Sequence, residues 1–187
     1  MSVRLVELIS PSYRDAQVAL HADPLGYGTR SGSRGDRWAS TVLGVATHYD
    51  CWSLLDYGSG HGSLGRALHG TRLAVREFDP AVKGKDSMPS FADLVASIDV
   101  LEHIEPERLD AVLAHLRLLA RKAVFLVVST RPSRATLLDG RNAHLIVEPA
   151  EWWHSRVEAS GFTVQPVPAI PENVKRPGHA WIAVVTP

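Results

Sequence analysis

Two carboxylates and a histidine stand close together in the stretch DVLEHIEPERLD, which begins at Asp99. Asp99, Glu102 and His103 follow an apolar run, and such side chains are costly to bury without partners. If the chain turns directly after that run, all three can face one cavity. Two carboxylate oxygens and an imidazole can bind a hard or borderline divalent cation. The spacing therefore indicates a site that could hold a metal.

A second histidine, His144, stands further along in the loop sequence DGRNAHLIVEPAEWW and could supply another ligand. Arg131 and Arg141 flank the same region, and loops placed on a rigid sheet often carry function. Either arginine could bind an acidic group on a substrate, or both could be solvated surface charges. One of the adjacent residues Trp152 and Trp153 is expected in the core, and the other is a candidate for lining a substrate cavity.

Alternating glycines form the second chemical signal, in LLDYGSGHGSLG. Gly58, Gly60 and Gly62 come directly after an apolar run, where glycine allows sharp turns and close approach of a ligand. Residues 60–65 also match the dinucleotide pattern G-x-G-x-x-G. Asp56, however, stands at the mouth of this loop, where it would repel a pyrophosphate. The loop therefore indicates a ligand that carries positive charge.

These residues depend on alternating strands and helices. We expect strands at residues 53–57, 72–79, 92–99, 122–130, 162–170 and 179–186. We expect helices at residues 3–20 with a break near Pro11, 37–49, 63–70, 106–120 and 149–161. The alternation predicts an α/β fold, a Rossmann-like three-layer sandwich with a mostly parallel sheet. The last two strands share a short link and should pair antiparallel, and Pro166 and Pro168 place one of them at an edge.

The carboxyl ends of the predicted strands carry the polar residues. Asp56, Asp79, Asp99 and Thr130 all fall there, and ligands of such sheets bind at these ends. A carboxylate that ends the second strand can accept hydrogen bonds from both ribose hydroxyls. Asp79 is the candidate, with Glu77 as the alternative if the strand ends two residues earlier.

The pattern D-x-G-x-G-x-G resembles motif I of the class I S-adenosylmethionine-dependent methyltransferases, and the resemblance extends from Ser53 to Thr130. It implies S-adenosylmethionine as the methyl donor. The implied donor-binding residues are Asp56, Gly58, Ser59, Gly60, Gly62, Asp79, Asp99 and Val100. Residues 80–91 are too few for the helix and third strand that this family has there. The third strand is therefore expected to be missing, with Met88 and Phe91 as candidate adenine contacts.

The order D-x-x-E-H followed by a distant histidine is similar to two methyltransferase families, one acting on the terminal 2′-hydroxyl of small RNAs and one on phenols in ubiquinone synthesis. The resemblance implies that Glu102, His103 and His144 are catalytic and hold Mg²⁺, Mn²⁺ or Zn²⁺ against the acceptor oxygen. Those families usually have Glu as the first acid, where this chain has the shorter Asp99. Without a metal, His103 or His144 could act as a general base, or Glu102 and His103 could cap the next helix.

Length and composition favour one soluble domain. The chain has 187 residues and a net charge of zero, so it lacks the basic surplus that is typical of nucleic-acid binders. Its single cysteine, Cys51, fits a reducing compartment. No signal peptide or membrane span is recognised, and we expect a cytoplasmic protein. Residues 1–50 should add N-terminal helices and a lid loop, including Tyr13 and Tyr27, to a methyltransferase core at 51–187.

Together these patterns predict a methyltransferase that acts on an oxygen of a small molecule, such as a sugar, phenol or natural-product hydroxyl. One alternative is an RNA 2′-O or base methyltransferase, for which Arg30, Arg34 and Arg37 could form a small basic track. Another is a non-catalytic subunit that binds S-adenosylmethionine. Nitrogen remains an open acceptor, and no pattern indicates an oligomeric state.

Overall fold

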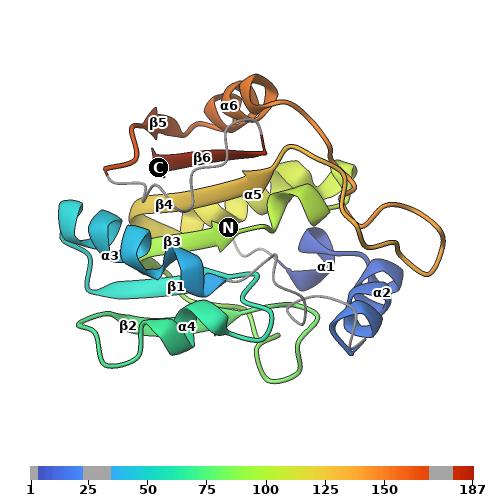
Figure 1. The fold of residues 1–187 in the computed structure, drawn as a ribbon, viewed down its shortest axis with the longest axis horizontal. Helices are drawn as coiled ribbons and strands as arrows, with labels where there is room; N and C mark the ends of the chain where they lie inside the picture. The colour runs from blue at the N-terminus through green and yellow to red at the C-terminus, as the bar shows by residue number, and fades with distance from the viewer. Residues whose placement is uncertain (1–3, 23–34, 169–178) are drawn as a thin grey trace.

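The computed structural model describes residues 4–22, 35–168 and 179–187 as a sheet with helices on both faces (Figure 1). The strands are β1 (Ser53–Tyr57), β2 (Ala74–Phe78), β3 (Ala92–Ile98), β4 (Ala120–Ser129), β5 (Thr163–Gln165) and β6 (Ala180–Thr186). The helices are α1 (Leu5–Leu8), α2 (Pro11–Ala22), α3 (Ala39–His48), α4 (Ser63–Ala67), α5 (Leu109–Leu119) and α6 (Ala150–Ala159). Short 3-10 turns are η1 (Gly35–Trp38), η2 (Leu101–His103) and η3 (Pro106–Arg108).

The sheet has the strand order β2-β1-β3-β4-β6-β5. The first four strands in this order are parallel, and β6 pairs antiparallel with both β4 and β5. This arrangement confirms the predicted mostly parallel sheet with two antiparallel strands at the end. The short strand β5 lies at the edge, as Pro166 and Pro168 predicted. Parallel pairing brings the carboxyl ends of β1, β2 and β3 to one side of the molecule.

Side chains on the two faces of the sheet pack into two separate hydrophobic cores. One core joins α1, α5 and α6 to one face, with Leu113 and Trp153 completely buried. The other joins η1, α3 and α4 to the opposite face, with Val42 and Phe125 completely buried. The strand β4 contributes to both because its successive residues point to opposite faces. A sheet covered on both faces explains why the run in β4 is almost entirely apolar.

The region between β2 and β3 confirms that the expected third strand of the family is missing. Residues 80–91 contain turns and bends but neither a helix nor a strand. As a result, β2 is an edge strand and β1 pairs with both β2 and β3. The sheet thus lacks the third family strand, and the cavity at its carboxyl end needs a wall from another part of the chain.

The N-terminal helices begin two residues later and end two residues later than expected, at Leu5 and Ala22. The break falls between α1 and α2, where the Ser10 hydroxyl accepts the Tyr13 amide (3.2 Å) and Pro11 occupies the first helical position. The predicted lid residue Tyr27, with Arg30 and Arg34, lies outside the described residues. Across the described ranges, the structure contains no helix long and apolar enough to cross a membrane.

Candidate active site

A cavity of about 610 Å³ opens at the carboxyl ends of β1, β2 and β3, a size that suits a small ligand. Its walls come from the glycine loop, the strand ends, the turn after β3 and the helix α2. Seven of the eight predicted donor-binding residues line it, namely Asp56, Gly58, Ser59, Gly60, Asp79, Asp99 and Val100. The eighth, Gly62, lies behind the loop against Glu77.

Two glycines of the loop have close neighbours. Gly58 has φ +77°, and a Cβ atom there would lie 2.4 Å from Cγ2 of Val100. Gly62 has φ +76°, and a Cβ atom there would lie 2.3 Å from Oε1 of Glu77. Both positions have a left-handed backbone that favours glycine. The branched Val100 leaves no room for a side chain at Gly58, whereas the atoms near Gly62 are the ends of the flexible side chains of Glu77 and Lys85.

Asp79 shapes the loop from the end of β2. Its Oδ2 accepts the Gly60 amide at 2.8 Å and its Oδ1 accepts the Ala81 amide at 2.9 Å. His21 of α2 approaches the same carboxylate, with Nε2 at 3.9 Å from Oδ2. Glu77, the alternative considered above, instead pairs with Lys85 at 2.9 Å and does not line the cavity. This placement favours Asp79 as the ribose acceptor.

Asp56 is buried under the glycine loop. Burial, together with the nearby carboxylates of Glu77 and Asp79, raises its pKa to about 7. Lys85 opposes this shift and also donates from Nζ to the Gly60 carbonyl at 2.9 Å. A positively charged ligand in the cavity would stabilise the ionised Asp56.

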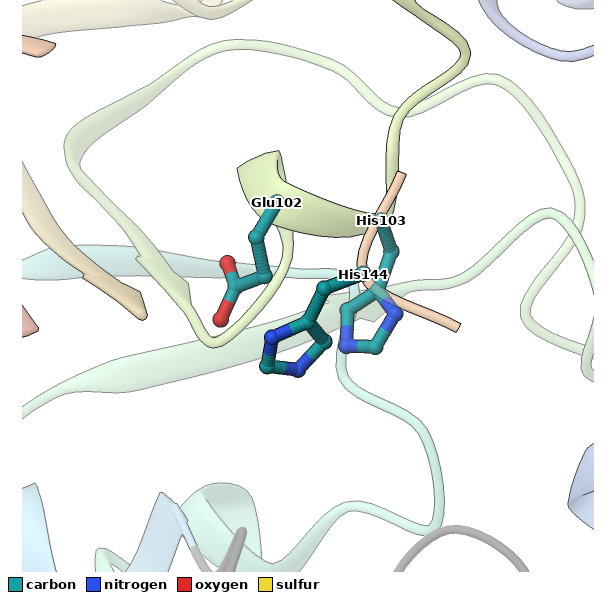
Figure 2. Close-up of side chains that lie close together, drawn as sticks. All are labelled: Glu102, His103 and His144. Atoms are coloured by element: carbon teal, nitrogen blue, oxygen red, sulfur yellow. The ribbon is translucent and has the colours of Figure 1, made fainter. Parts of the chain in front are cut away.

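Glu102, His103 and His144 come together, as Figure 2 shows. One ligand atom from each lies within 4.8 Å of the others. Nδ1 of His103 donates to the Ala143 carbonyl at 2.7 Å, and Nδ1 of His144 donates to the Arg131 carbonyl at 2.6 Å. A carbonyl only accepts, so Nδ1 carries the proton in both rings and Nε2 carries the lone pair.

The Glu102 carboxylate completes this cluster. Its Oε1 accepts the Ser129 amide at 3.0 Å, whereas its buried Oε2 has no hydrogen-bond partner among the described residues. Burial and the neighbouring Asp99 raise the pKa of Glu102 well above its usual value. Burial, with a contribution from His144, lowers the pKa of His103 to about 3. Burial also lowers the pKa of His144, so both imidazoles are neutral near pH 7, the state in which histidine binds metals.

Asp99 stands next to this cluster without belonging to it. It follows β3 directly with φ +53°, an uncommon left-handed conformation for a non-glycine residue. Burial raises its pKa to about 6, and Arg37 opposes this shift. Strained backbone of this kind concentrates at functional sites, and Asp99 lines the cavity beside Gly58.

The helix α2 is tied to both sides of the cavity. The Tyr13 hydroxyl donates to the His103 carbonyl at 2.6 Å, and the Ser10 hydroxyl donates to Glu105 at 2.6 Å. On the other side, Arg14 donates to the Pro80 carbonyl at 2.6 Å. Sequence reasoning had missed Ser10, Arg14 and Glu105, and no local pattern marks such long-range pairs.

Two further candidates lie away from the cavity. Met88 is 40% exposed, and Phe91 is 52% exposed under the Arg121 guanidinium at the start of β3. The structure therefore does not bring either predicted adenine contact to the cavity, because the segment runs toward the opposite end of the sheet.

The two adjacent tryptophans lie in different environments. Trp153 is in the core, as predicted. Trp152 lines a separate groove beside Pro106 and Leu109 and not the main cavity, so its role at a substrate cavity stays a prediction. Of the two arginines, Arg141 pairs with Asp139 at 2.6 Å and lies 6.0 Å from the Tyr13 ring.

No protein-family model and no curated protein sequence matches the chain. Solved structures do match. The 1,6-didemethyltoxoflavin-N1-methyltransferase of Burkholderia thailandensis, with bound 1,6-didemethyltoxoflavin and S-adenosylhomocysteine, is 16% identical with a TM-score of 0.66, over 100% of this chain and 92% of that one. The complex of DhpI with SAH is 20% identical with a TM-score of 0.62, over 96% of this chain and 98% of that one. The methyltransferase domain of bacterial CtHen1-CN is 19% identical with a TM-score of 0.54, over 81% and 98%. At these identities the likeness establishes the fold.

Proposed function

We propose that this chain, which has the fold of the class I S-adenosylmethionine-dependent methyltransferases, is itself such an enzyme and transfers a methyl group to an oxygen of a small molecule. One observation carries the proposal: His103 lines the cavity of the glycine loop and also belongs to the Glu102–His103–His144 cluster. A donor site and a site able to hold an acceptor oxygen therefore adjoin. Two of the similar structures carry S-adenosylhomocysteine, which supports the choice of donor.

The chain's own residues fit this donor. The sulfonium group of S-adenosylmethionine supplies an activated methyl group when this donor is bound. Asp79 is placed at the end of β2 to accept the ribose hydroxyls, and the glycine loop lets the backbone approach closely. The carboxylate of Asp56 adds negative potential beneath the loop, which favours a ligand with an ammonium and a sulfonium group.

The acceptor side fits a divalent cation held by Oε2 of Glu102 and Nε2 of both histidines. The unpaired Oε2 and the fixed tautomers support this assignment, because metal-binding histidines commonly donate their second nitrogen to a carbonyl. A bound cation would supply a Lewis acid that lowers the pKa of an acceptor hydroxyl. One oxygen and two imidazole nitrogen ligands suit Zn²⁺ better than Mg²⁺ or Mn²⁺.

The pKa of His103 argues against the metal-free alternative for that residue. A general base works best when its pKa lies near the operating pH, and a pKa of about 3 makes His103 a weak base. Binding to a cation needs only its lone pair. His144 is the better candidate if the reaction needs a base instead.

Calorimetry with S-adenosylhomocysteine tests the donor site, and titration of Zn²⁺, Mn²⁺ and Mg²⁺ into the loaded protein tests the cluster. We expect saturable binding of both, with cation binding weakened at least tenfold in Glu102→Gln and His144→Ala. The control is His154→Ala, at a half-exposed histidine on α6. No cation binding would overturn the metal assignment, and no binding of S-adenosylhomocysteine would overturn the whole proposal.

Turnover then identifies the acceptor class. Catechols, vicinal diols, sugars and a short RNA are incubated with S-adenosylmethionine, and the demethylated product is measured. Metal-dependent product with small hydroxyl compounds is the expected result. Product with RNA alone, decreasing with salt, would favour the nucleic-acid alternative. Donor binding without turnover on any acceptor would favour a non-catalytic subunit.

A further inference from the structure

The cavity wall beside Pro80 and Ala81 is built by α2. Residues 80–91 form neither a helix nor a strand, so the chain has no local element to cover this side. Arg14 fastens α2 there, because its guanidinium donates to the Pro80 carbonyl at 2.6 Å and pairs with Asp86 at 2.7 Å. The helix α2 thus occupies the side of the cavity left open by the missing helix and strand.

One face of α2 lines the cavity along its length. Tyr13, Gln17 and His21 are spaced by four residues and all contact the cavity. Tyr13 marks the end near the Glu102–His103–His144 cluster, since its hydroxyl bonds to the His103 carbonyl. His21 marks the end near Asp79, because its Nε2 lies 3.9 Å from Oδ2 of Asp79. Gln17 lies one turn from each, on the turn of the helix that Arg14 fastens to Pro80.

Gln17 is a buried polar residue that lines this cavity. It is only 7% exposed, and its Nε2 makes no hydrogen bond of normal geometry with the described residues. The amide lies close enough to the Tyr13 hydroxyl to oppose the rise of the Tyr13 pKa, and that hydroxyl itself donates to the His103 carbonyl. Buried polar groups in folded proteins are nearly always paired. An unpaired amide that faces a ligand cavity therefore indicates a partner on the ligand.

We infer that Gln17 binds the edge of the adenine base of the methyl donor, so that α2 supplies the base recognition that residues 80–91 do not. This inference rests on the proposed function. A primary amide offers a donor and an acceptor side by side, which matches the exocyclic amine and a ring nitrogen of adenine. With the ribose held at Asp79, the same cavity offers the apolar side chains of Ala81, Val100 and Ile104 as contacts for a flat ring.

The test compares two ligands by calorimetry: S-adenosylhomocysteine and its purine analogue, which lacks only the exocyclic amine. Wild-type protein should bind S-adenosylhomocysteine more tightly, on the order of tenfold to a hundredfold. Gln17→Met, of similar length and without the amide, should lose most of this preference while binding the purine analogue as wild type does. Gln165→Met, on β5 and outside the cavity, should keep the preference.

The ratio of the two affinities separates recognition from folding. Equal loss of both ligands in Gln17→Met and also in Gln17→Leu would show that Gln17 only supports α2, and would overturn the inference. The same conclusion follows if wild type binds both ligands equally well. If wild type binds neither ligand, the proposed function itself fails, which is a different result from failure of base recognition alone.

Discussion

The contact between Gly58 and Val100 allows a quantitative prediction about the glycine loop. A Cβ atom at Gly58 would lie 2.4 Å from Cγ2 and 2.9 Å from Cγ1 of Val100, whereas carbon atoms pack at about 3.5–4.0 Å. The left-handed backbone at φ +77° costs an alanine about 1–2 kcal/mol. The overlap adds about 1–3 kcal/mol, as expected for overpacking. Gly58→Ala should therefore lower the free energy of unfolding by about 2–5 kcal/mol.

Shortening Val100 should relieve the overlap but not the backbone cost. In Val100→Ala the nearest remaining side-chain atom is Cβ, 3.2 Å from the new methyl group, which a small shift can accommodate. Urea unfolding of wild type, both single variants and the double variant forms a double-mutant cycle. We expect the double variant to be more stable than the sum of the single effects by about 1–3 kcal/mol.

Gly70→Ala is the matched control for the backbone cost. Gly70 has φ +79°, and a Cβ atom there meets no atom within 4 Å. It should lose only the left-handed penalty of about 1–2 kcal/mol. Additive effects of Gly58→Ala and Val100→Ala, within about 0.5 kcal/mol, would refute the idea that this contact fixes the loop. So would equal losses in Gly58→Ala and Gly70→Ala.

Three further predictions concern buried groups. Asp56 has a pKa raised by burial to about 7, so the folded protein holds its proton while the unfolded chain loses it near pH 4, and stability falls as pH rises between these values. Asp56→Asn should match wild type at pH 4 and gain up to roughly 4 kcal/mol at pH 8 in urea unfolding. The control Asp93→Asn, at a carboxylate whose pKa is lowered, should show the opposite sign. Tyr13→Phe removes the hydrogen bond to the His103 carbonyl and should lower the free energy of unfolding by about 1 kcal/mol. It should also weaken cation binding in calorimetry. Unchanged cation affinity would contradict a role of Tyr13 in positioning His103. Trp153→Ala should lower the free energy of unfolding by about 3–5 kcal/mol, because Trp153 is completely buried. Thermal unfolding should show a clearly smaller loss for Trp152→Ala. Equal losses would contradict the placement of Trp153 alone in the core.

Much of the fold was predictable because the sheet is covered on both faces. An apolar run such as that of β4 can only be accommodated between two layers, and the glycine cluster after β1 marks the strand end unambiguously. The spacing of Glu102 and His103 was informative because the turn η2 follows β3 at once. His144 was predicted from its place in the loop sequence and from the resemblance to the two methyltransferase families. The structure brings it into the cluster through its backbone and loop contacts.

Other parts of the site were not predictable because they depend on contacts between distant segments. Nothing near Gln17 in the sequence shows that α2 would stand beside Pro80, since the pairing runs through the side chain of Arg14. Phe91 has a side chain suited to contact adenine, but it does not line the cavity. The segment carrying it returns to the start of β3, where Arg121 covers the ring.

The omission between β2 and β3 also bears on how the molecule avoids self-association. Without a third strand, β2 pairs with β1 alone among the described residues, and a free strand edge is a template for pairing with another chain. Charged side chains occupy this short strand at Arg76 and Glu77. The Arg76 guanidinium donates to the carbonyl of Phe91 at 2.6 Å, so it ties the returning segment to the strand. We therefore expect the ionic side chains of β2 to oppose edge-to-edge pairing at the side where the helix and strand are missing.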